Sequence, residues 1–181
     1  MPPGAVLLFE DETILRLFPV LRRAWSLRGV QAIVPITGKN AKRVLFGTIN
    51  PKTGHRIVLR RANMRQESYQ DFLRLLRHSY PGRDIWLLLD EAPCHIAPKS
   101  QALARALHIE LVWLPKQCSE LNAMDQLWRG LKHDISANYQ FKDIAAHATC
   151  AEAWISALTN SETLRKAGVC SEHFWLRSFL P

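Results

Sequence analysis

Three aspartates of this sequence are placed where they could bind metal ions together. Asp11 follows the apolar run 5–9, Asp90 follows the apolar run 85–89, and Asp125 borders the apolar face of a predicted helix. Three converging carboxylates repel one another, so such a site needs positive charge at neutral pH. Mg²⁺ is held by carboxylate oxygens, and two divalent ions can promote phosphodiester cleavage. The acids therefore predict a site for two Mg²⁺ or Mn²⁺ ions.

The elements that position these acids follow from the apolar pattern. The runs 5–9 and 85–89 are typical of central strands buried on both faces. In open α/β sheets, ligands bind at the carboxyl ends of the strands. We therefore expect Asp11 and Asp90 at the ends of two neighbouring strands.

The third acid belongs to a helix. Apolar residues recur there at spacings of 3, 4, 3 and 4, and Ser119 precedes them as a candidate N-cap; they are Leu121, Met124, Trp128, Leu131 and Ile135. This pattern predicts an amphipathic helix that directs Asp125 toward the strand ends. The remaining pattern predicts a hairpin of strands 44–49 and 56–59, a strand over 109–114, and helices over 69–79, 98–107 and 143–158.

Composition restricts the class of protein. The chain has 181 residues, 48% of them hydrophobic, so one α/β domain with a packed core is expected. Four scattered cysteines indicate neither a disulfide scaffold nor a redox motif, and no apolar run reaches the roughly 20 residues of a membrane helix. We expect a soluble cytoplasmic protein. His95 beside Cys94 could suggest zinc, but no second ligand pair stands at zinc-finger spacing, so a structural His is expected.

Positive charge is concentrated in the first third of the chain. The net charge is +8, and residues 13–66 contain twelve Lys or Arg and no Asp or Glu. In most proteins this would be a solvated face, but beside a phosphodiester-cleaving site it could bind phosphates. The candidate DNA-binding residues are Arg22, Arg23, Arg28, Lys39, Lys42 and Arg43. Core positions are expected for Trp25, Trp86, Trp113 and Trp128, although Trp25 could equally stack on a base or on a partner subunit.

Five segments resemble, in order and spacing, the catalytic domain of mariner-like transposases and their bacterial insertion-sequence relatives: LLFEDETILRLFP, RRAWSLRG, VLFGTINPKTG, IWLLLDEAPCH and VWLPKQCSELNAMDQLWRGLK. Those families carry a DDE or DDD triad on a ribonuclease H-like fold, and 34 residues typically separate the second and third acids. The same number separates Asp90 from Asp125. The resemblance implies an α/β ribonuclease H-like fold with a mixed five-stranded sheet flanked by helices, and it implies that Asp11, Asp90 and Asp125 are catalytic metal ligands.

Details of the motifs agree with the family or depart from it. His95 matches a His that commonly follows the second acid. Glu91 stands where the bacterial relatives usually have Asn, and Asn122-Ala123 stands where they have Asn-Pro. The third acid is Asp, as in mariner elements. Glu10, Glu12 and Glu91 are expected to be surface or neighbouring acids and not metal ligands.

The resemblance implies a nuclease and strand transferase that acts on DNA, at element ends and at a target, as a homodimer. The expected organisation is a catalytic domain over 1–140, a packed helical extension over 141–181, and no N-terminal helix-turn-helix, so a separate helix-turn-helix partner is possible. Two alternatives stay open. One is a ribonuclease H-type nuclease acting on RNA–DNA hybrids, and the other is an inactive or truncated remnant that only binds DNA or oligomerises.

Overall fold

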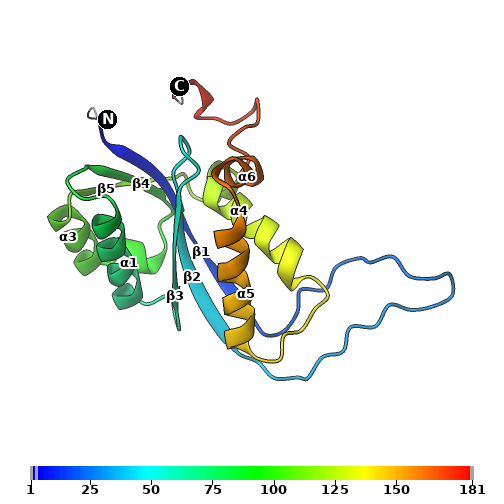
Figure 1. Ribbon diagram of the computed structural model, residues 1–181. Helices are drawn as coiled ribbons and strands as arrows, with labels where there is room; N and C mark the ends of the chain where they lie inside the picture. The colour runs from blue at the N-terminus through cyan, green and yellow to red at the C-terminus, as the bar shows by residue number, and fades with distance from the viewer. Residues whose placement is uncertain (1, 3, 180–181) are drawn as a thin grey trace.

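The computed structural model describes residues 2 and 4–179, which form a mixed five-stranded sheet between two helical layers (Figure 1). The strands are β1 (Val6–Arg16), β2 (Lys42–Ile49), β3 (Arg56–Arg61), β4 (Ile85–Leu89) and β5 (Ile109–Trp113). Their order is β3-β2-β1-β4-β5, in which the first three are antiparallel and β1, β4 and β5 are parallel. The predicted sheet and its hairpin are confirmed.

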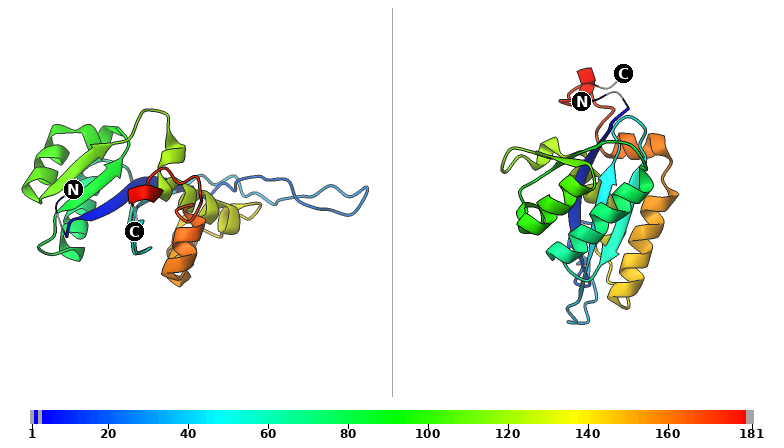
Figure 2. Two further views of the ribbon diagram at one scale, coloured as in Figure 1. Left: turned by 90° about the horizontal axis from the view of Figure 1, so that it is seen from above. Right: turned by 90° about the vertical axis from the view of Figure 1, so that its left-hand side faces the viewer.

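Helices cover both faces of this sheet. They are α1 (Gln66–Ser79), α2 (Pro93–Ile96), α3 (Pro98–Ala106), α4 (Ala123–Leu131), α5 (Ile144–Ala157) and α6 (Asn160–Lys166). Helices α1 to α3 lie on one side, and α4 to α6 lie on the other (Figures 1 and 2). Among the described residues, no helix combines the length and apolarity that crossing a bilayer requires.

Strand β1 is longer than the sequence predicts. Only Val6–Phe9 pairs with β4, but β1 continues to Arg16 because its second half pairs with β2. Asp11 therefore lies inside a strand and not at its end, which corrects the expected position. It still lies just beyond the last residue paired with β4, beside Asp90 at the end of that strand.

The helix that carries Asp125 also differs from the expected one. Ser119 does not cap it. A 3-10 turn occupies Ser119–Leu121, and α4 begins after Asn122, whose side chain accepts a hydrogen bond from the Met124 amide. The expected last turn is a π-helix over Lys132–Ser136.

Two of the predicted core tryptophans are exposed. The side chain of Trp25 is fully exposed, and Trp113 is 37% exposed at the end of the edge strand β5, whereas Trp128 is buried as predicted. A strand at the edge of a sheet has no neighbour beyond it to cover such a side chain.

The C-terminal region adds helices to one face of the sheet. Helix α5 confirms the helix predicted over 143–158, and its residues Ile144, Ala148, Ala151 and Ile155 join the core formed with β1, β2 and α4. Helix α6 follows with a capping box at Thr159 and Glu162; it lies within the helical extension expected over 141–181, but its bounds were not predicted. Whether residue 140 is a domain boundary stays a prediction.

The connection between β1 and β2 is an extended arm, residues 17–41, without helices or paired strands of its own. It projects far from the body of the molecule (Figures 1 and 2). Asn138 bonds both the amide and the carbonyl of Arg22, and Gln140 bonds the amide and the hydroxyl of Thr37. One loop therefore holds both sides of the arm near its base.

Candidate active site

The three predicted acids line one cavity of about 140 Å³. Asp11 comes from β1, Asp90 from the end of β4 and Asp125 from α4. The rest of the wall comes mainly from the connection between β5 and α4: Glu91, Leu114, Pro115, Lys116, Gln117, Cys118, Ser119 and Asn122. The structure therefore brings together the side chains that were expected to converge.

Close packing of α4 on the sheet places Asp125. Gly47 of β2 is the residue paired with Asp11, and it leaves room for α4. A Cβ on Gly47 would lie 2.5 Å from Trp128 Cζ2 and 2.6 Å from Met124 Cε, closer than real side chains come. Only glycine at this position allows α4 to lie this close to β2.

Two hydrogen bonds fix the same helix along β1. Asn122 Nδ2 donates to the carbonyl of Glu10 at 2.7 Å, and Trp128 Nε1 donates to the carbonyl of Asp11 at 3.3 Å. Both donors are buried. Because they hold the strand on both sides of the Asp11 side chain, the separation of Asp11 and Asp125 is set by the main chain of β1.

Electrostatics in the cavity favour a cation. Burial, followed by the charges of Glu12 and Asp125, raises the pKa of Asp11 to about 8. Arg129 Nη2 lies 2.6 Å from Asp125 Oδ2 and is the cation nearest to that acid. A buried carboxyl that resists ionisation beside other acids, as Asp11 does, is a group whose charge a hard divalent cation stabilises. The residues present therefore fit Mg²⁺ or Mn²⁺.

Asp90 has a different environment from Asp11. Its side chain is 63% exposed, yet its Oδ1 atom accepts hydrogen bonds from His95 Nδ1 at 3.1 Å and from the Ala92 amide at 3.0 Å. The bond from His95 holds the pKa of Asp90 below its ordinary value. Asp90 is therefore ionised under conditions in which Asp11 retains a proton.

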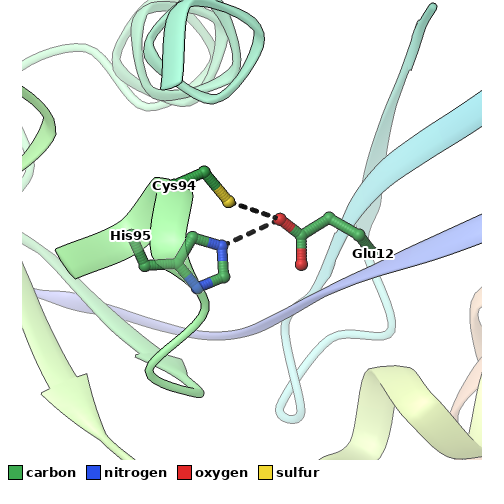
Figure 3. Close-up of side chains that lie close together, drawn as sticks. All are labelled: Glu12, Cys94 and His95. Atoms are coloured by element: carbon green, nitrogen blue, oxygen red, sulfur yellow. Dashed lines mark hydrogen bonds and ion pairs between the residues drawn. The ribbon is translucent and has the colours of Figure 1, made fainter. Parts of the chain in front are cut away.

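Glu10 and Glu12 lie on the opposite face of β1 from Asp11, because neighbouring residues of a strand point to opposite faces. His95 Nε2 is 2.9 Å from Glu12 Oε1 and 3.3 Å from Glu10 Oε2. Figure 3 shows His95 and Cys94, both from α2, directed at the same oxygen of Glu12. Burial and then the charge of Glu12 raise the pKa of Glu10 well above its ordinary value. The side chains of Glu10 and Glu12 are buried, so neither lies at the surface, and neither is among the residues that line the cavity.

Glu91, the third acid that we did not expect to be a ligand, does line the cavity. Its carboxylate lies 3.0 Å from Lys116 Nζ. This ion pair joins the connection that follows β4 to the connection that follows β5. The cavity wall therefore includes one further carboxylate and one ammonium group.

The predicted DNA-binding residues lie on the arm and at the start of β2. Arg22, Arg23, Arg28 and Lys39 are exposed arm residues, and Lys42 and Arg43 begin β2. The structure thus places the basic residues on one continuous segment that leads away from β1 and returns to β2.

Sequence reasoning missed the residues that hold the acids in place. Asn122 could have been recognised as an N-cap, since Asn is among the best residues at that position. Glu12 could have been assigned to the face opposite Asp11 from strand alternation alone. No sequence signal shows that Gly47 lies beneath α4.

Comparison with known proteins places this geometry in a family. The model of the DDE superfamily endonucleases matches residues 6–146. The chain is 26% identical over 134 residues to an insertion element IS630 39 kDa protein of Shigella sonnei, a match that covers 73% of this chain and 39% of that protein. It is 31% identical over 114 residues to protein y4pE/y4sA of Sinorhizobium fredii, covering 61% and 81%.

Solved structures share the fold. The mariner Mos1 transposase paired-end complex with Mg superposes with a TM-score of 0.72 at 18% identity, over 94% of this chain and 54% of that one. The catalytic domain of Mos1 transposase gives a TM-score of 0.62 at 15% identity, over 91% and 76%. The ribonuclease H-like fold is therefore confirmed. Because the family model spans most of the sequence, the chain belongs to the DDE superfamily endonucleases.

Proposed function

We propose that this chain is a transposase catalytic domain that uses divalent metal ions to cleave DNA and to join strands. The observation that carries the proposal is the convergence of Asp11, Asp90 and Asp125 on one cavity. The chain spans about two fifths of the IS630 protein and half of the Mos1 chain in its complexes, so activity is proposed for the part that carries these acids.

Asp11, Asp90 and Asp125 would hold the metal, and the proposal includes two ions. Bound divalent ions activate an attacking oxygen and stabilise the leaving oxygen of a phosphodiester. The raised pKa of Asp11 supports this assignment, since a carboxyl crowded by other acids releases its proton more readily when a cation is bound. Several Mos1 structures contain Mg or Mn, which is the metal class that this donor set fits.

DNA is the proposed substrate, at both element ends and target. The arm and the start of β2 carry the six basic residues named above, and residues 13–66 contain no acid to oppose them. Lys and Arg neutralise phosphates without reading sequence. Structures of Mos1 with transposon-end DNA show that a protein of this fold binds such a substrate.

The arm is also the proposed contact with a second copy of the chain. It exposes large apolar side chains that no described part of this chain covers, including Trp25 at 103% and Ile33 at 85% exposure. Apolar side chains gathered on a projecting segment are typical of an interaction site.

We further propose that base recognition is supplied by a helix-turn-helix partner, because the helices of the described region pack on the sheet.

Nicking of supercoiled plasmid tests the proposed function. We expect nicking in Mg²⁺ or Mn²⁺, none in EDTA, and none for Asp90→Asn, which keeps the size of the side chain but removes its charge. Equal nicking by Asp90→Asn would contradict the assignment. A parent protein that binds DNA but never nicks it would indicate the inactive remnant.

A further inference from the structure

We propose that His95, braced by Glu12, is a positioning residue that fixes one oxygen of Asp90 and leaves the other oxygen for the metal. This inference rests on the proposed function, because Asp90 must be a metal ligand for its orientation to matter. It assigns a role to the buried polar cluster of Glu12, Cys94 and His95, which lies on the face of the sheet opposite α4. None of the three acids of the cavity belongs to this cluster.

His95 can hold Asp90 because its own ring is immobile. The side chain is 1% exposed, its ring centroid lies 4.5 Å from that of Tyr69, and α2 supplies its backbone. Nδ1 lies 3.0 Å from the Asp90 carbonyl oxygen and 3.1 Å from Asp90 Oδ1. Nε2 lies 2.9 Å from Glu12 Oε1. With both nitrogens occupied, the ring cannot turn without breaking a hydrogen bond.

Asp90 needs such support more than the other two acids do. Asp11 lies within a strand and Asp125 within a helix, but Asp90 follows the last residue of β4 and its side chain is largely exposed. An exposed aspartate on a connecting segment is free to change rotamer. Two donors, the His95 ring and the Ala92 amide, hold Oδ1 in one place.

The two bonds at Oδ1 leave Oδ2 available. Among the described residues, no hydrogen-bond donor or cation is found at Asp90 Oδ2. The side chain lines the cavity that Asp11 and Asp125 share, so the remaining oxygen is the one that a metal can use. Partners that orient a metal ligand typically change metal affinity or activity by 10- to 100-fold when they are removed.

Glu12 completes the arrangement from the other side of the sheet. It is the neighbour of Asp11 in β1, so one strand supplies one acid to the cavity directly and a second acid that acts through His95. Cys94 adds a hydrogen bond to the same Glu12 oxygen at 3.3 Å. The oxygen that braces the ring is therefore itself held in place.

The test compares two replacements of His95 that each keep one donor. In His95→Asn the amide nitrogen lies near the former Nδ1 position, and in His95→Gln it lies near the former Nε2 position. We expect His95→Gln to weaken Mn²⁺ binding by 10- to 100-fold and His95→Asn to weaken it less, measured by calorimetry on the full chain without DNA. Glu12→Gln, which keeps the size of the brace, should weaken binding by a few fold.

His147→Gln is the matched control. His147 is also buried and bonded through both ring nitrogens, to Ser136 Oγ and to the Arg16 carbonyl, but it is not among the residues that line the cavity. Its replacement should lower the melting temperature without changing Mn²⁺ affinity.

In plasmid nicking, His95→Gln should raise the Mg²⁺ concentration needed for half-maximal rate, with a smaller effect on the rate at saturating metal.

The outcomes separate this inference from the proposed function. If the parent protein binds no Mn²⁺, both fail. If the parent binds Mn²⁺ and Asp90→Asn does not, but both His95 variants bind as the parent does, only the positioning role fails. Stoichiometric zinc in the purified protein that disappears in Cys94→Ser would make His95 Nε2 a ligand instead of a donor, and this would also overturn the inference.

Discussion

Asn122 Nδ2 donates a 2.7 Å hydrogen bond to the carbonyl of Glu10, and the same side chain caps α4 by accepting from the Met124 amide. One buried amide thus joins the strand of the first acid to the helix of the third. A helix that begins at this bond has a fixed position along β1, so Asp125 is aligned with Asp11 before any metal binds.

Replacing Asn122 with Ala should therefore reduce both stability and nicking. Loss of an N-cap costs roughly 1 kcal/mol, and the unpaired carbonyl of Glu10 costs about 1–3 kcal/mol more. Urea denaturation measures the loss of stability. Plasmid nicking, under conditions in which the variant is folded, measures the loss of activity.

Asp143→Ala is the control for this variant. Asp143 caps α5 in the same way, by accepting from the Ala146 amide, but it is exposed and is not among the residues that line the cavity. It should lose about 1 kcal/mol and keep its nicking rate. Equal loss of nicking in both variants would mean that general stability, and not the position of α4, limits the activity.

Gly47→Ala should displace α4 from the sheet. The added methyl group would meet Trp128 and Met124 at 2.5 and 2.6 Å, and overpacking of this kind costs roughly 1–3 kcal/mol. We expect a lower melting temperature and slower nicking, and Met124→Ala in the same chain should recover part of both. Gly130→Ala is the control, because its methyl group would lie 3.7 Å from Trp154 and would fit within α4. Undiminished nicking by Gly47→Ala would show that the placement of Asp125 tolerates movement of the helix.

The convergence of the three acids could be predicted because it depends on local patterns. The run 85–89 and the periodicity around Asp125 define a strand and a helix without reference to the rest of the chain. The length of β1 could not be predicted in this way. After the apolar run come four polar residues, 10–13, and the chain continues as a strand there because β2 pairs with it; this pairing depends on residues that follow the arm.

The contacts that hold the acids of the site in place could not be predicted from local patterns either. His95 and Glu12 are 83 positions apart, and their contact depends on how α2 follows β4 across the sheet. Zinc-finger spacing concerns residues close in sequence, whereas Cys94 and His95 are 82 and 83 positions from Glu12. For the arm, the positive charge was evident from the sequence, but its projection from the body of the molecule was not (Figure 2).

The contribution of His147 to the free energy of unfolding should fall in mild acid. Burial holds the pKa of His147 below its ordinary value, so the folded state favours the neutral ring. In the unfolded chain the ring takes up a proton near pH 6.5, so at this group the unfolded state binds more protons below that pH, and the contribution of His147 to stability decreases as the pH falls. The free energy of unfolding of the parent, minus that of His147→Gln, should therefore decrease as the pH falls from about 7.5 to about 5, a range that extends roughly one unit or more on each side of the unfolded pKa. His78→Gln, which alters an exposed ring, should retain the slope of the parent.

Arm charges should determine the salt dependence of DNA binding. Replacing Arg22, Arg23 and Arg28 with Gln removes three exposed cations, and each phosphate contact contributes about 0.9 to the slope of log affinity against log salt. We expect the slope to fall by up to about 3, equally on inverted-repeat and scrambled duplexes. Replacing Arg74, Lys99 and Arg105 with Gln should change the slope little, because these residues lie on α1 and α3 and not on the arm. A parent protein that prefers one sequence at fixed salt would contradict the expectation that the arm binds only phosphates.

Asp125 offers the sharpest test of the triad, because its length can be changed without changing its charge. Asp125→Ala should abolish metal-dependent nicking and leave salt-sensitive DNA binding nearly intact, since α4 is anchored by Met124, Leu127 and Trp128 and not by the acid. Asp125→Glu extends the carboxylate by one methylene into the shared cavity, so partial nicking should survive if Asp11 and Asp90 tolerate the shift. Glu120→Ala is the control: Glu120 lies in the preceding 3-10 turn, outside the residues that line this cavity, and its loss should not alter the rate. If Asp125→Ala nicked as fast as the parent while Glu120→Ala did not, the third ligand would have to be reassigned to Glu120, and the cavity would have to rearrange to admit it.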